Sequence, residues 1–269
     1  MKKIELEELR VIQMDILSAV HHFCCKKNIK YSLACGTMLG CARHKGYIPW
    51  DDDIDICLLR DDYNRMVKEF PPLLNDRYKF CTMERDKKWA SPYGKVCDEK
   101  TIIYEGKNSF GINIDVFPID KVPEDQEKWL TYDKLRRLII RLYSERAGDY
   151  YQYHFKKERN IFVNLTVIGV KFILNRVPIN IIAKAVDKYA KIYNKSNSEK
   201  VFECVQGIFL KKPFSCTLFE ELILMPFEDR EFLAFKNYDE YLTNGFGNWR
   251  QLPPVEKRIT HHIFQAWWK

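Results

Sequence analysis

The acidic segment DDDIDICLL, residues 51–59, constrains this chain more than any other part of its sequence. Ile54 and Ile56 alternate with Asp53 and Asp55, and a period of two is typical of a β-strand that buries one face. Asp53 and Asp55 would then project from the same face, about 6–7 Å apart along the backbone. Like charges at that distance repel unless a cation neutralises them, and carboxylate oxygens are ligands that hard divalent ions prefer. The segment therefore predicts a Mg²⁺ or Mn²⁺ site rather than an exposed acidic loop.

A second strand-like segment, GINIDVFPID, places Asp115 inside an apolar alternating run. A lone buried charge is costly, so Asp115 should have a partner, and the metal held by Asp53 and Asp55 is the candidate. A small-residue turn at Gly36 and Thr37 offers a backbone that a phosphate can approach closely. Three carboxylates on two strands, opposite such a turn, predict metal-assisted phosphoryl or nucleotidyl transfer.

The remaining pattern predicts one compact α/β (α+β) domain that spans residues 1–269. Apolar residues at helical spacing indicate a first helix over 6–23, and strand-like runs separated by turns recur between 31 and 120. From about 122 to 200 the pattern is helical, which we interpret as a helical subregion within the same domain. Near the C-terminus, the apolar run 221–235 is typical of a β-hairpin.

Composition excludes several classes of protein. The chain has no run of twenty uncharged apolar residues, so a membrane span is not expected. Its nine cysteines, an odd number without a C-x-x-C pair, predict free thiols in a reducing cytoplasm rather than disulfides or structural zinc. The N-terminal MKKIELEELR lacks the apolar core of a signal peptide. A net charge of +7 suits acidic ligands without identifying one.

Basic residues between 134 and 159 precede the most apolar segment of the chain, residues 161–174. The apolar segment is too short to span a membrane and has the length of a buried or interfacial helix. Two interpretations stay open. The basic residues form a solvated helix face, which is the commoner case, or residues 134–174 make peripheral contact with anionic lipid at the inner face of the membrane.

Four segments of the chain together resemble the LicD family, which includes phosphocholine transferases of bacterial surface glycans and the fukutin-related proteins. The longest is YSLACGTMLGCARHKGYIPWDDDIDICLLRDDYNRM, and it is too long and specific to match by chance. The others are YGKVCDEKT, GINIDVFPID and YLTNGFGNWRQLPPVEKRITHH. The resemblance covers both ends of the chain, and residues 122–200 match only loosely, as loops and insertions vary within families.

The resemblance implies a nucleotidyltransferase-like fold, in which flanking helices and a helical insertion surround a mixed sheet. It further implies that a phospho-alcohol, phosphocholine above all, passes from a CDP-activated donor to a sugar hydroxyl of a cell-surface glycan, with release of CMP. In the family's motif, Gly36 and Thr37 match the small-residue turn, Asp53 and Asp55 match the metal-binding pair, and Asp115 matches the third carboxylate. These three aspartates are therefore the expected catalytic and Mg²⁺-binding residues.

The implied partners are a CDP-linked alcohol, with CDP-choline favoured, and a glycan acceptor, free or lipid-linked, such as lipopolysaccharide, teichoic acid or capsule. Nucleic acid is not an expected partner. The CDP-activated donor agrees with the cytoplasmic location that the cysteines indicate.

Several residues of these motifs are candidates for substrate binding. The planar guanidinium of Arg43 suits a phosphate. His44 could donate to substrate, or it could be a structural histidine beside Trp50. The cationic candidates farther along the chain are equally consistent with exposed side chains that bind no substrate. The full predicted set is Gly36, Thr37, Arg43, His44, Asp51, Lys95, Lys257, Arg258 and His262.

Aromatic residues could form a cage for a quaternary ammonium group if choline is the alcohol. The candidates are Trp89, Tyr93, Trp249, Trp267 and Trp268, and the alternative for most of them is a place in the core. 

Two other functional classes compete with the phosphotransferase. A nucleotidyltransferase that moves the nucleotide itself, to a small molecule or a nucleic acid, shares the acidic triad. A catalytically silent binding or scaffold protein is the third class, and the intact Asp53, Asp55 and Asp115 argue against it.

Overall fold

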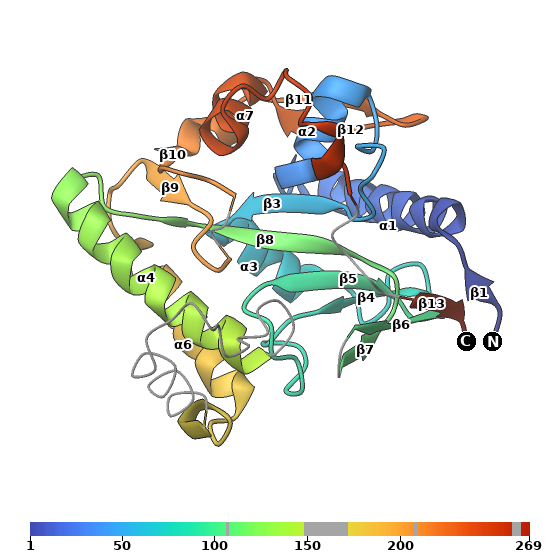
Figure 1. The fold of residues 1–269 in the computed structure, drawn as a ribbon, viewed down its shortest axis with the longest axis horizontal. Helices are drawn as coiled ribbons and strands as arrows, with labels where there is room; N and C mark the ends of the chain where they lie inside the picture. The colour runs from blue at the N-terminus through green and yellow to red at the C-terminus, as the bar shows by residue number, and fades with distance from the viewer. Residues whose placement is uncertain (106–107, 148–171, 207–208, 260–264) are drawn as a thin grey trace.

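The structure of the protein is a computed structural model that describes residues 1–105, 108–147, 172–206, 209–259 and 265–269. These residues form an α+β fold around a curled mixed sheet, with helices on both sides (Figure 1). The α+β class and the mixed sheet predicted from the sequence are thereby confirmed.

The largest described sheet has the strand order β10-β9-β8-β3-β2, and β5 joins β4 to the edge of β8. Its strands are β2 (Ser32–Leu33), β3 (Asp55–Leu59), β4 (Tyr78–Cys81), β5 (Gly94–Asp98), β8 (Asn113–Lys121), β9 (Lys200–Phe202) and β10 (Phe214–Ser215). Strands β3 and β8 are parallel, whereas β5 and β9 run antiparallel to β8. Parallel neighbours need a long crossover, and residues 60–112 provide it.

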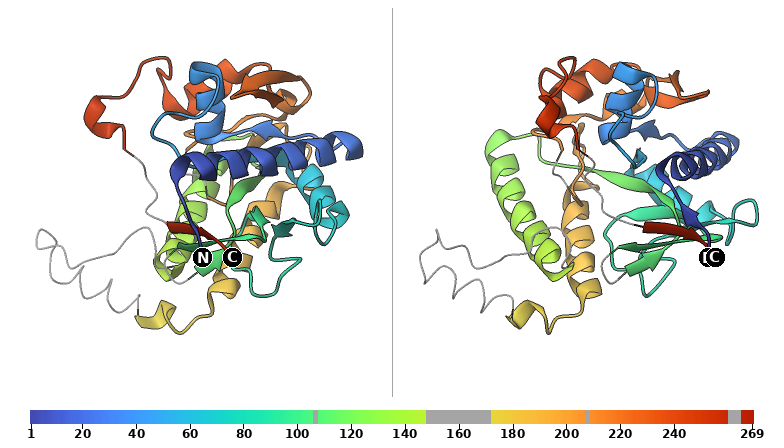
Figure 2. Two further views of the ribbon diagram at one scale, coloured as in Figure 1. Left: turned by 90° about the vertical axis from the view of Figure 1, so that its right-hand side faces the viewer. Right: turned by 45° about the vertical axis from the view of Figure 1, so that its right-hand side comes forward.

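The described helices lie around this sheet. They are α1 (Leu6–Lys27), α2 (Cys35–His44), α3 (Arg60–Glu69), α4 (Gln126–Ala147), α6 (Ile179–Ala190) and α7 (Tyr238–Phe246), with the short 3₁₀ turns η1 (Lys191–Tyr193), η2 (Cys216–Phe219) and η3 (Val255–Lys257). Helices α1 and α3 pack against β8, and α4 packs against α6. In Figure 2, α1 and the α4–α6 pair lie on opposite sides of the molecule.

Two smaller sheets complete the described fold. One contains β1 (Lys3–Ile4), β13 (Gln265–Trp268), β6 (Thr101–Glu105) and β7 (Asn108–Phe110), and the other is the hairpin of β11 (Leu222–Phe227) and β12 (Arg230–Phe235). Pairing of β1 with β13 brings the two ends of the chain side by side (Figure 1). The hairpin predicted over 221–235 is confirmed.

Two elements begin at places that the periodicity did not indicate. Strand β3 starts at Asp55, so Asp53 lies in an irregular segment before the strand rather than on it. Helix α2 starts at Cys35, so Gly36 and Thr37 form its first turn instead of a loop. Cys35 itself takes a left-handed conformation with φ of 47°.

Helices α4 and α6 fall within the range predicted to be helical, and residues 148–171 lie outside the described residues. Most of the apolar segment 161–174 and part of the basic stretch are therefore not described, and membrane contact through 134–174 stays a prediction. In the described part of the chain, no helix combines the length and hydropathy needed to cross a bilayer.

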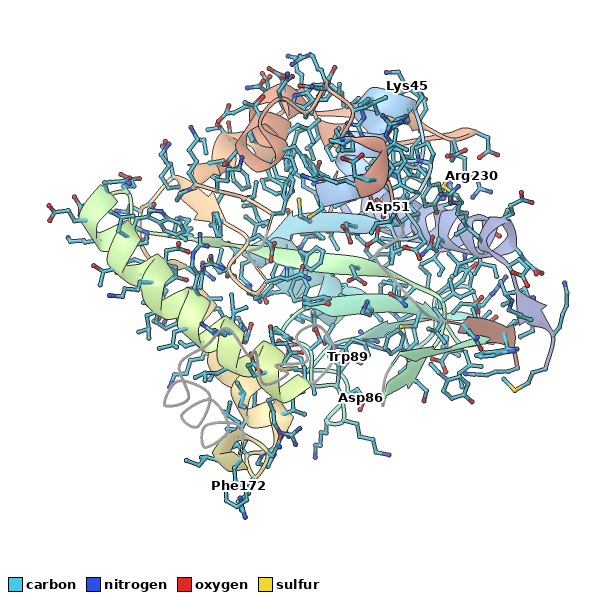
Figure 3. The ribbon with its side chains drawn as sticks, viewed as in Figure 1. Lys45, Asp51, Asp86, Trp89, Phe172 and Arg230 are labelled. Atoms are coloured by element: carbon cyan, nitrogen blue, oxygen red, sulfur yellow. The ribbon has the colours of Figure 1, made fainter. Side chains whose placement is uncertain are left out.

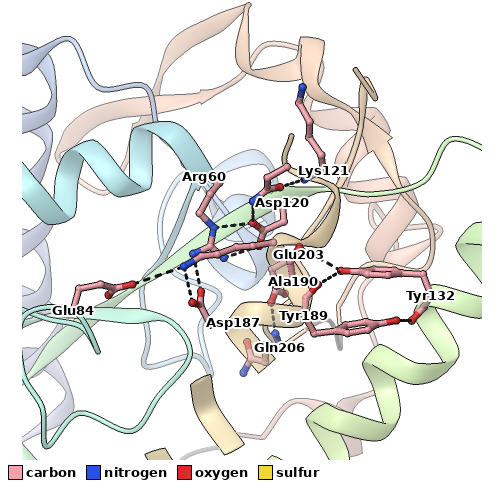
Figure 4. Close-up of polar contacts among 12 residues, drawn as sticks. Arg60, Glu84, Asp120, Lys121, Tyr132, Asp187, Tyr189, Ala190, Glu203 and Gln206 are labelled. Carbon is pink, nitrogen blue, oxygen red and sulfur yellow. Dashed lines mark hydrogen bonds and ion pairs between the residues drawn. The ribbon is translucent and has the colours of Figure 1, made fainter. Parts of the chain in front are cut away.

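A buried ionic network fastens α3 and α6 to the end of β8 (Figure 4). The Arg60 guanidinium donates through Nε and Nη2 to both carboxylate oxygens of Asp120, at 2.7 and 2.6 Å, and through Nη1 to Asp187 on α6 at 3.1 Å. Asn194 donates to the same Asp120 at 2.6 Å. Arg60 is 5% exposed and Asp120 fully buried, so each charge depends on its partner.

We expect Arg60→Met to lower the free energy of unfolding by about 3–5 kcal/mol, because it leaves the buried Asp120 carboxylate without its cation. Urea denaturation followed by circular dichroism measures the loss. Lys236→Met is the control, since Lys236 makes an ion pair with Glu221 in which both side chains are more than half exposed, and we expect at most about 1 kcal/mol there. Equal losses in the two variants would contradict this interpretation.

Candidate active site

The parallel register of β3 and β8 sets Asp55 directly beside Asp115. Side chains at paired positions of neighbouring strands project to the same face, so two carboxylates that are sixty residues apart in sequence meet. The flanking residues Ile54, Ile56 and Val116 are fully buried. Core packing therefore fixes the strands, and the strands fix the carboxylates.

Helix α1 holds the irregular acidic segment that precedes β3. Arg10 Nη2 donates to the backbone carbonyl oxygens of Pro49, at 3.1 Å, and Asp51, at 2.5 Å. Gln13 Nε2 donates to the carbonyl of Asp52 at 2.9 Å, and Gln13 is buried. Neither Arg10 nor Gln13 was a predicted site residue. The periodicity of the segment that contains them indicated only an amphipathic helix. Their contacts with residues 49–52 are long-range, so the sequence pattern did not reveal them.

The first turn of α2 closes over the acidic segment from the other side. The backbone N–H of Asp55 donates to Thr37 Oγ1 at 2.8 Å, and Thr37 is buried. A Cβ atom at Gly36 would stand 2.7 Å from Asp51 Oδ2. Only glycine lets the Asp51 carboxylate come this close to the helix. Gly36 thus lines the site, whereas Thr37 serves to anchor the start of β3.

Asp55 sits in a strongly unfavourable electrostatic environment. Burial raises its pKa well above the usual range, and the neighbouring carboxylates of Asp53, Asp115 and Asp51 raise the pKa further. Lys95 acts in the opposite direction. Three acidic side chains therefore act on Asp55 at this end of the sheet, and Asp53 reaches this acidic cluster from the irregular segment before β3.

Lys95 on β5 is the partner that the structure gives Asp115. Its Nζ donates to Asp115 Oδ1 at 2.5 Å and to Asn113 Oδ1 at 3.1 Å, and both Lys95 and Asp115 are largely buried. The antiparallel register of β5 with β8 pairs these two positions. Sequence reasoning named Lys95 as a phosphate candidate and missed this ion pair, because it depends on which strand lies at the edge of β8.

A cleft of about 1400 Å³ opens onto the acidic cluster. Asp51, Asp53 and Asp55 line it together with Lys95. Segments from both halves of the chain line it. They include residues of α2, of the β4–β5 connection, of α4 and of the C-terminal segment 246–257. The cleft is large enough for a drug-sized or nucleotide-sized molecule.

The donor chemistry of the acidic cluster fits a hard divalent cation, because carboxylate oxygens are what Mg²⁺ binds and because such an ion relieves the repulsion around Asp55. Geometry fits less completely. Across the described ranges, no three His, Cys, Asp or Glu side chains are gathered closely enough to hold a metal. Lys95 contacts Asp115 Oδ1, so an ion shared by all three predicted ligands would have to share or displace that contact.

Arg43 and His44 end α2 at the rim of the cleft. Arg43 Nη1 donates to the carbonyl of Trp249 at 2.9 Å, and its Nε donates to His44 Nε2 at 3.0 Å. Burial and, secondly, Arg43 lower the pKa of His44, which packs edge-on against Trp50. Arg43 lines the cleft. His44 has the contacts of a histidine that orients Arg43, which is the structural alternative that the sequence left open.

The C-terminal candidates take different positions. Lys257 lines the cleft, and Arg258 stacks on Trp50 at 5.7 Å while donating to the carbonyl of Pro253. His262 lies outside the described residues.

The five aromatic candidates separate into groups. Trp89 and Tyr93 line the cleft beside Lys95 (Figure 3 labels Trp89). Trp249 also lines it, but it is buried and its Nε1 donates to Asp239. Trp267 and Trp268 belong to β13, where Trp268 Nε1 donates to Glu8.

Comparison with known proteins gives consistent matches. Residues 28–140 match the family model described as "LicD/FKTN/FKRP, nucleotidyltransferase domain". The chain is 30% identical to the lipopolysaccharide cholinephosphotransferase LicD of Haemophilus influenzae, over 99% of each chain. It is also similar to uncharacterized proteins of Rickettsia prowazekii, 30% identical over 46% of this chain and 45% of that protein, and of Rickettsia typhi, 28% identical over 46% and 40%.

Asp55→Asn should raise the melting temperature at pH 7 by roughly 2–4 °C when a chelator is present, because it removes a buried charge from among like charges. A raised pKa means that the native state binds the proton more tightly, so wild-type stability falls as pH rises above the usual Asp pKa of about 4. The gain of the variant should therefore shrink as pH approaches 4.

Thermal unfolding between pH 4 and pH 7.5 measures this effect. Asp229→Asn is the matched control, because the Asp229 side chain is 78% exposed, and its melting temperature should follow that of the wild type at every pH. A gain in Asp55→Asn that does not vary with pH, or a loss at pH 7, would show that Asp55 is not under this repulsion.

Proposed function

This chain belongs to the LicD family, and from that premise we propose that it transfers phosphocholine from CDP-choline to a sugar hydroxyl of a cell-surface glycan, releasing CMP. The observation that carries the proposal is the 30% identity to a lipopolysaccharide cholinephosphotransferase over 99% of both chains. End-to-end coverage matters because the site draws residues from both halves of the chain, including Asp55 and Lys257.

The charges of the cleft support a diphosphate donor. Lys95, Arg43 and Lys257 line the same cleft as the acidic cluster, so cationic side chains are available for phosphate oxygens beside carboxylates that suit a metal. A site for an uncharged ligand needs neither. The proposed donor therefore lies with its two phosphates between these cations and the aspartates.

We propose that Asp53, Asp55 and Asp115 hold Mg²⁺, or Mn²⁺ in its place. A bound divalent ion would screen the negative charge of the donor phosphates and so permit an oxygen nucleophile to approach. The support is the charge crowding that raises the Asp55 pKa and the adjacent positions of Asp55 and Asp115.

The protein's own groups have separate roles in this proposal. The acceptor hydroxyl oxygen bonds to the phosphorus distal to cytidine, the bond from that phosphorus to the CMP oxygen breaks, and CMP leaves. We assign Asp115 as acceptor of the hydroxyl proton, since Lys95 fixes its carboxylate through Oδ1. Arg43, held by the Trp249 carbonyl, is assigned to the departing phosphate.

A second candidate is transfer of the nucleotide itself, and the description of the matching family model as a nucleotidyltransferase domain favours it. The two reactions attack different phosphorus atoms. With CDP-choline as donor, the first releases CMP and the second leaves CMP attached to the acceptor while releasing phosphocholine. Product analysis therefore separates them.

Incubation with CDP-choline, CDP-ribitol and CDP-glycerol, with Mg²⁺ and candidate glycans, should give glycan-dependent CMP release with CDP-choline. Asp53→Ala and Asp55→Ala should reduce the rate at least about 100-fold, because each removes a carboxylate that would hold the divalent ion on which the donor phosphates depend. Asp229→Ala, an exposed aspartate outside the cleft, should keep the wild-type rate. Wild-type turnover by Asp55→Ala, with circular dichroism unchanged, would refute the site.

Removal of divalent ions with EDTA should abolish CMP release, and added Mg²⁺ should restore it. Asp115→Asn should lower the rate at least about 100-fold and raise the Mg²⁺ concentration needed for half-maximal rate, because it removes a ligand charge and the proton acceptor together. Turnover that EDTA leaves unchanged would mean that the carboxylates act without a metal.

A further inference from the structure

Three aromatic side chains form one wall of the cleft beside the acidic cluster, and we call them the aromatic wall: Trp89, Tyr93 and Phe110. Trp89 and Phe110 approach edge to face, with ring centroids 6.2 Å apart at 61°. Trp89 Nε1 donates to the carbonyl of Tyr93 at 3.0 Å, and the Tyr93 ring packs on Phe117 at 4.7 Å. These contacts give the wall a fixed shape before any ligand arrives.

The aromatic wall already contacts a cation. Lys95 Nζ lies 5.3 Å from the centroid of the Phe110 ring and 5.8 Å from that of Tyr93. Both distances are within the range of about 6 Å over which ring faces attract positive charge. All three aromatic residues are half-buried, so part of each remains open to the cleft.

We propose that Trp89, Tyr93 and Phe110 form the subsite for the quaternary ammonium group of the donor, which selects choline over uncharged alcohols. This inference rests on the proposed function and identifies the residues that would bind its alcohol. A quaternary ammonium has no N–H to donate, so ring faces are suitable ligands for it. Polyols such as ribitol or glycerol carry hydroxyl groups that lose hydrogen bonds against an aromatic surface. The Asp86 carboxylate, on the same connection as Trp89 (Figure 3), also lines the cleft, and it forms an ion pair with Lys79 at 3.8 Å.

Lys95 marks the boundary between this subsite and the phosphate. Its Nζ forms an ion pair with Asp115 at 2.5 Å, and this pairing weakens the repulsion between Lys95 and a second cation. The same Nζ atom contacts both the acidic cluster and the aromatic wall. A phosphate on Lys95 would consequently place the ammonium end of the same short alcohol near the rings, farther from Lys95 and toward Trp89.

The test compares two probes of nearly equal shape, phosphocholine and its carbon isostere 3,3-dimethylbutyl phosphate, which lacks the positive charge. Isothermal titration of the full chain with each probe, in Mg²⁺, gives two dissociation constants. We expect wild type to bind phosphocholine on the order of tenfold more tightly, the preference that a desolvated cation–π site confers. Equal affinities for the two probes would overturn the proposal without any variant.

Trp89→Leu and Phe110→Leu should each reduce that preference to about twofold or less while binding of the uncharged isostere changes little. Trp89→Phe should keep most of it, because a ring face remains. Tyr104→Leu is the matched control. Tyr104 is 51% exposed and packs on Trp267 outside the cleft, so its loss should leave the tenfold preference intact. A preference that survives both leucine variants would overturn the assignment.

Outcomes for the subsite and for the reaction are distinguishable. A wild type that prefers phosphocholine tenfold, yet transfers nothing from CDP-choline, supports the subsite and refutes the proposed function. A wild type that transfers phosphocholine but binds both probes equally refutes the subsite alone. Should either leucine variant unfold, Trp89→Phe and the other leucine variant still decide between these outcomes.

Discussion

The parallel pairing of β3 with β8 is the constraint on which the rest of the site depends. It places Asp55 beside Asp115, and it does so inside a sheet whose flanking residues are buried, so the two charges cannot separate without disturbing the core. The surroundings are arranged to hold this pairing: Thr37 accepts from the Asp55 N–H, and Gln13 donates to the carbonyl of Asp52. The contacts that stabilise the fold therefore also position the carboxylates of the site.

Two buried carboxylates, Asp120 and Asp55, have contrasting electrostatic surroundings. Asp120 lies at one end of β8 and is fully compensated, with both oxygens on the Arg60 guanidinium and a further bond from Asn194. Asp55 is buried among other carboxylates, which raise its pKa. Compensation is typical of a structural carboxylate, whereas retained repulsion is typical of a site that binds a cation or a proton. The contrast explains why the acidic cluster, and not Asp120, is the candidate for chemistry.

The cleft combines the ligand types that the proposed phospho-alcohol donor needs. Carboxylates and cations stand at the acidic cluster, and the aromatic wall stands next to it, with Lys95 in contact with both. A surface with charged groups at one place and aromatic rings beside it would suit a ligand that is anionic in the middle and cationic at one end. Strand β8 connects these parts of the cleft, because it pairs with β3 along one edge and with β5 along the other.

The sequence by itself determined which residue types carry the chemistry. Apolar alternation around Asp55 and Asp115 required two strands with buried charges, and the motifs that contain them identified the LicD family.

The sequence did not determine how those strands pair. Asp53 lies before β3 rather than on it, and Lys95, whose role was left open, pairs with Asp115 because β5 adds to the edge of β8. The aromatic wall likewise needed the fold, since Trp89 and Phe110 meet across separate segments. Local periodicity reports which face of a strand is buried, whereas the partner of a buried charge is set by long-range register, and only the tertiary structure decides that register.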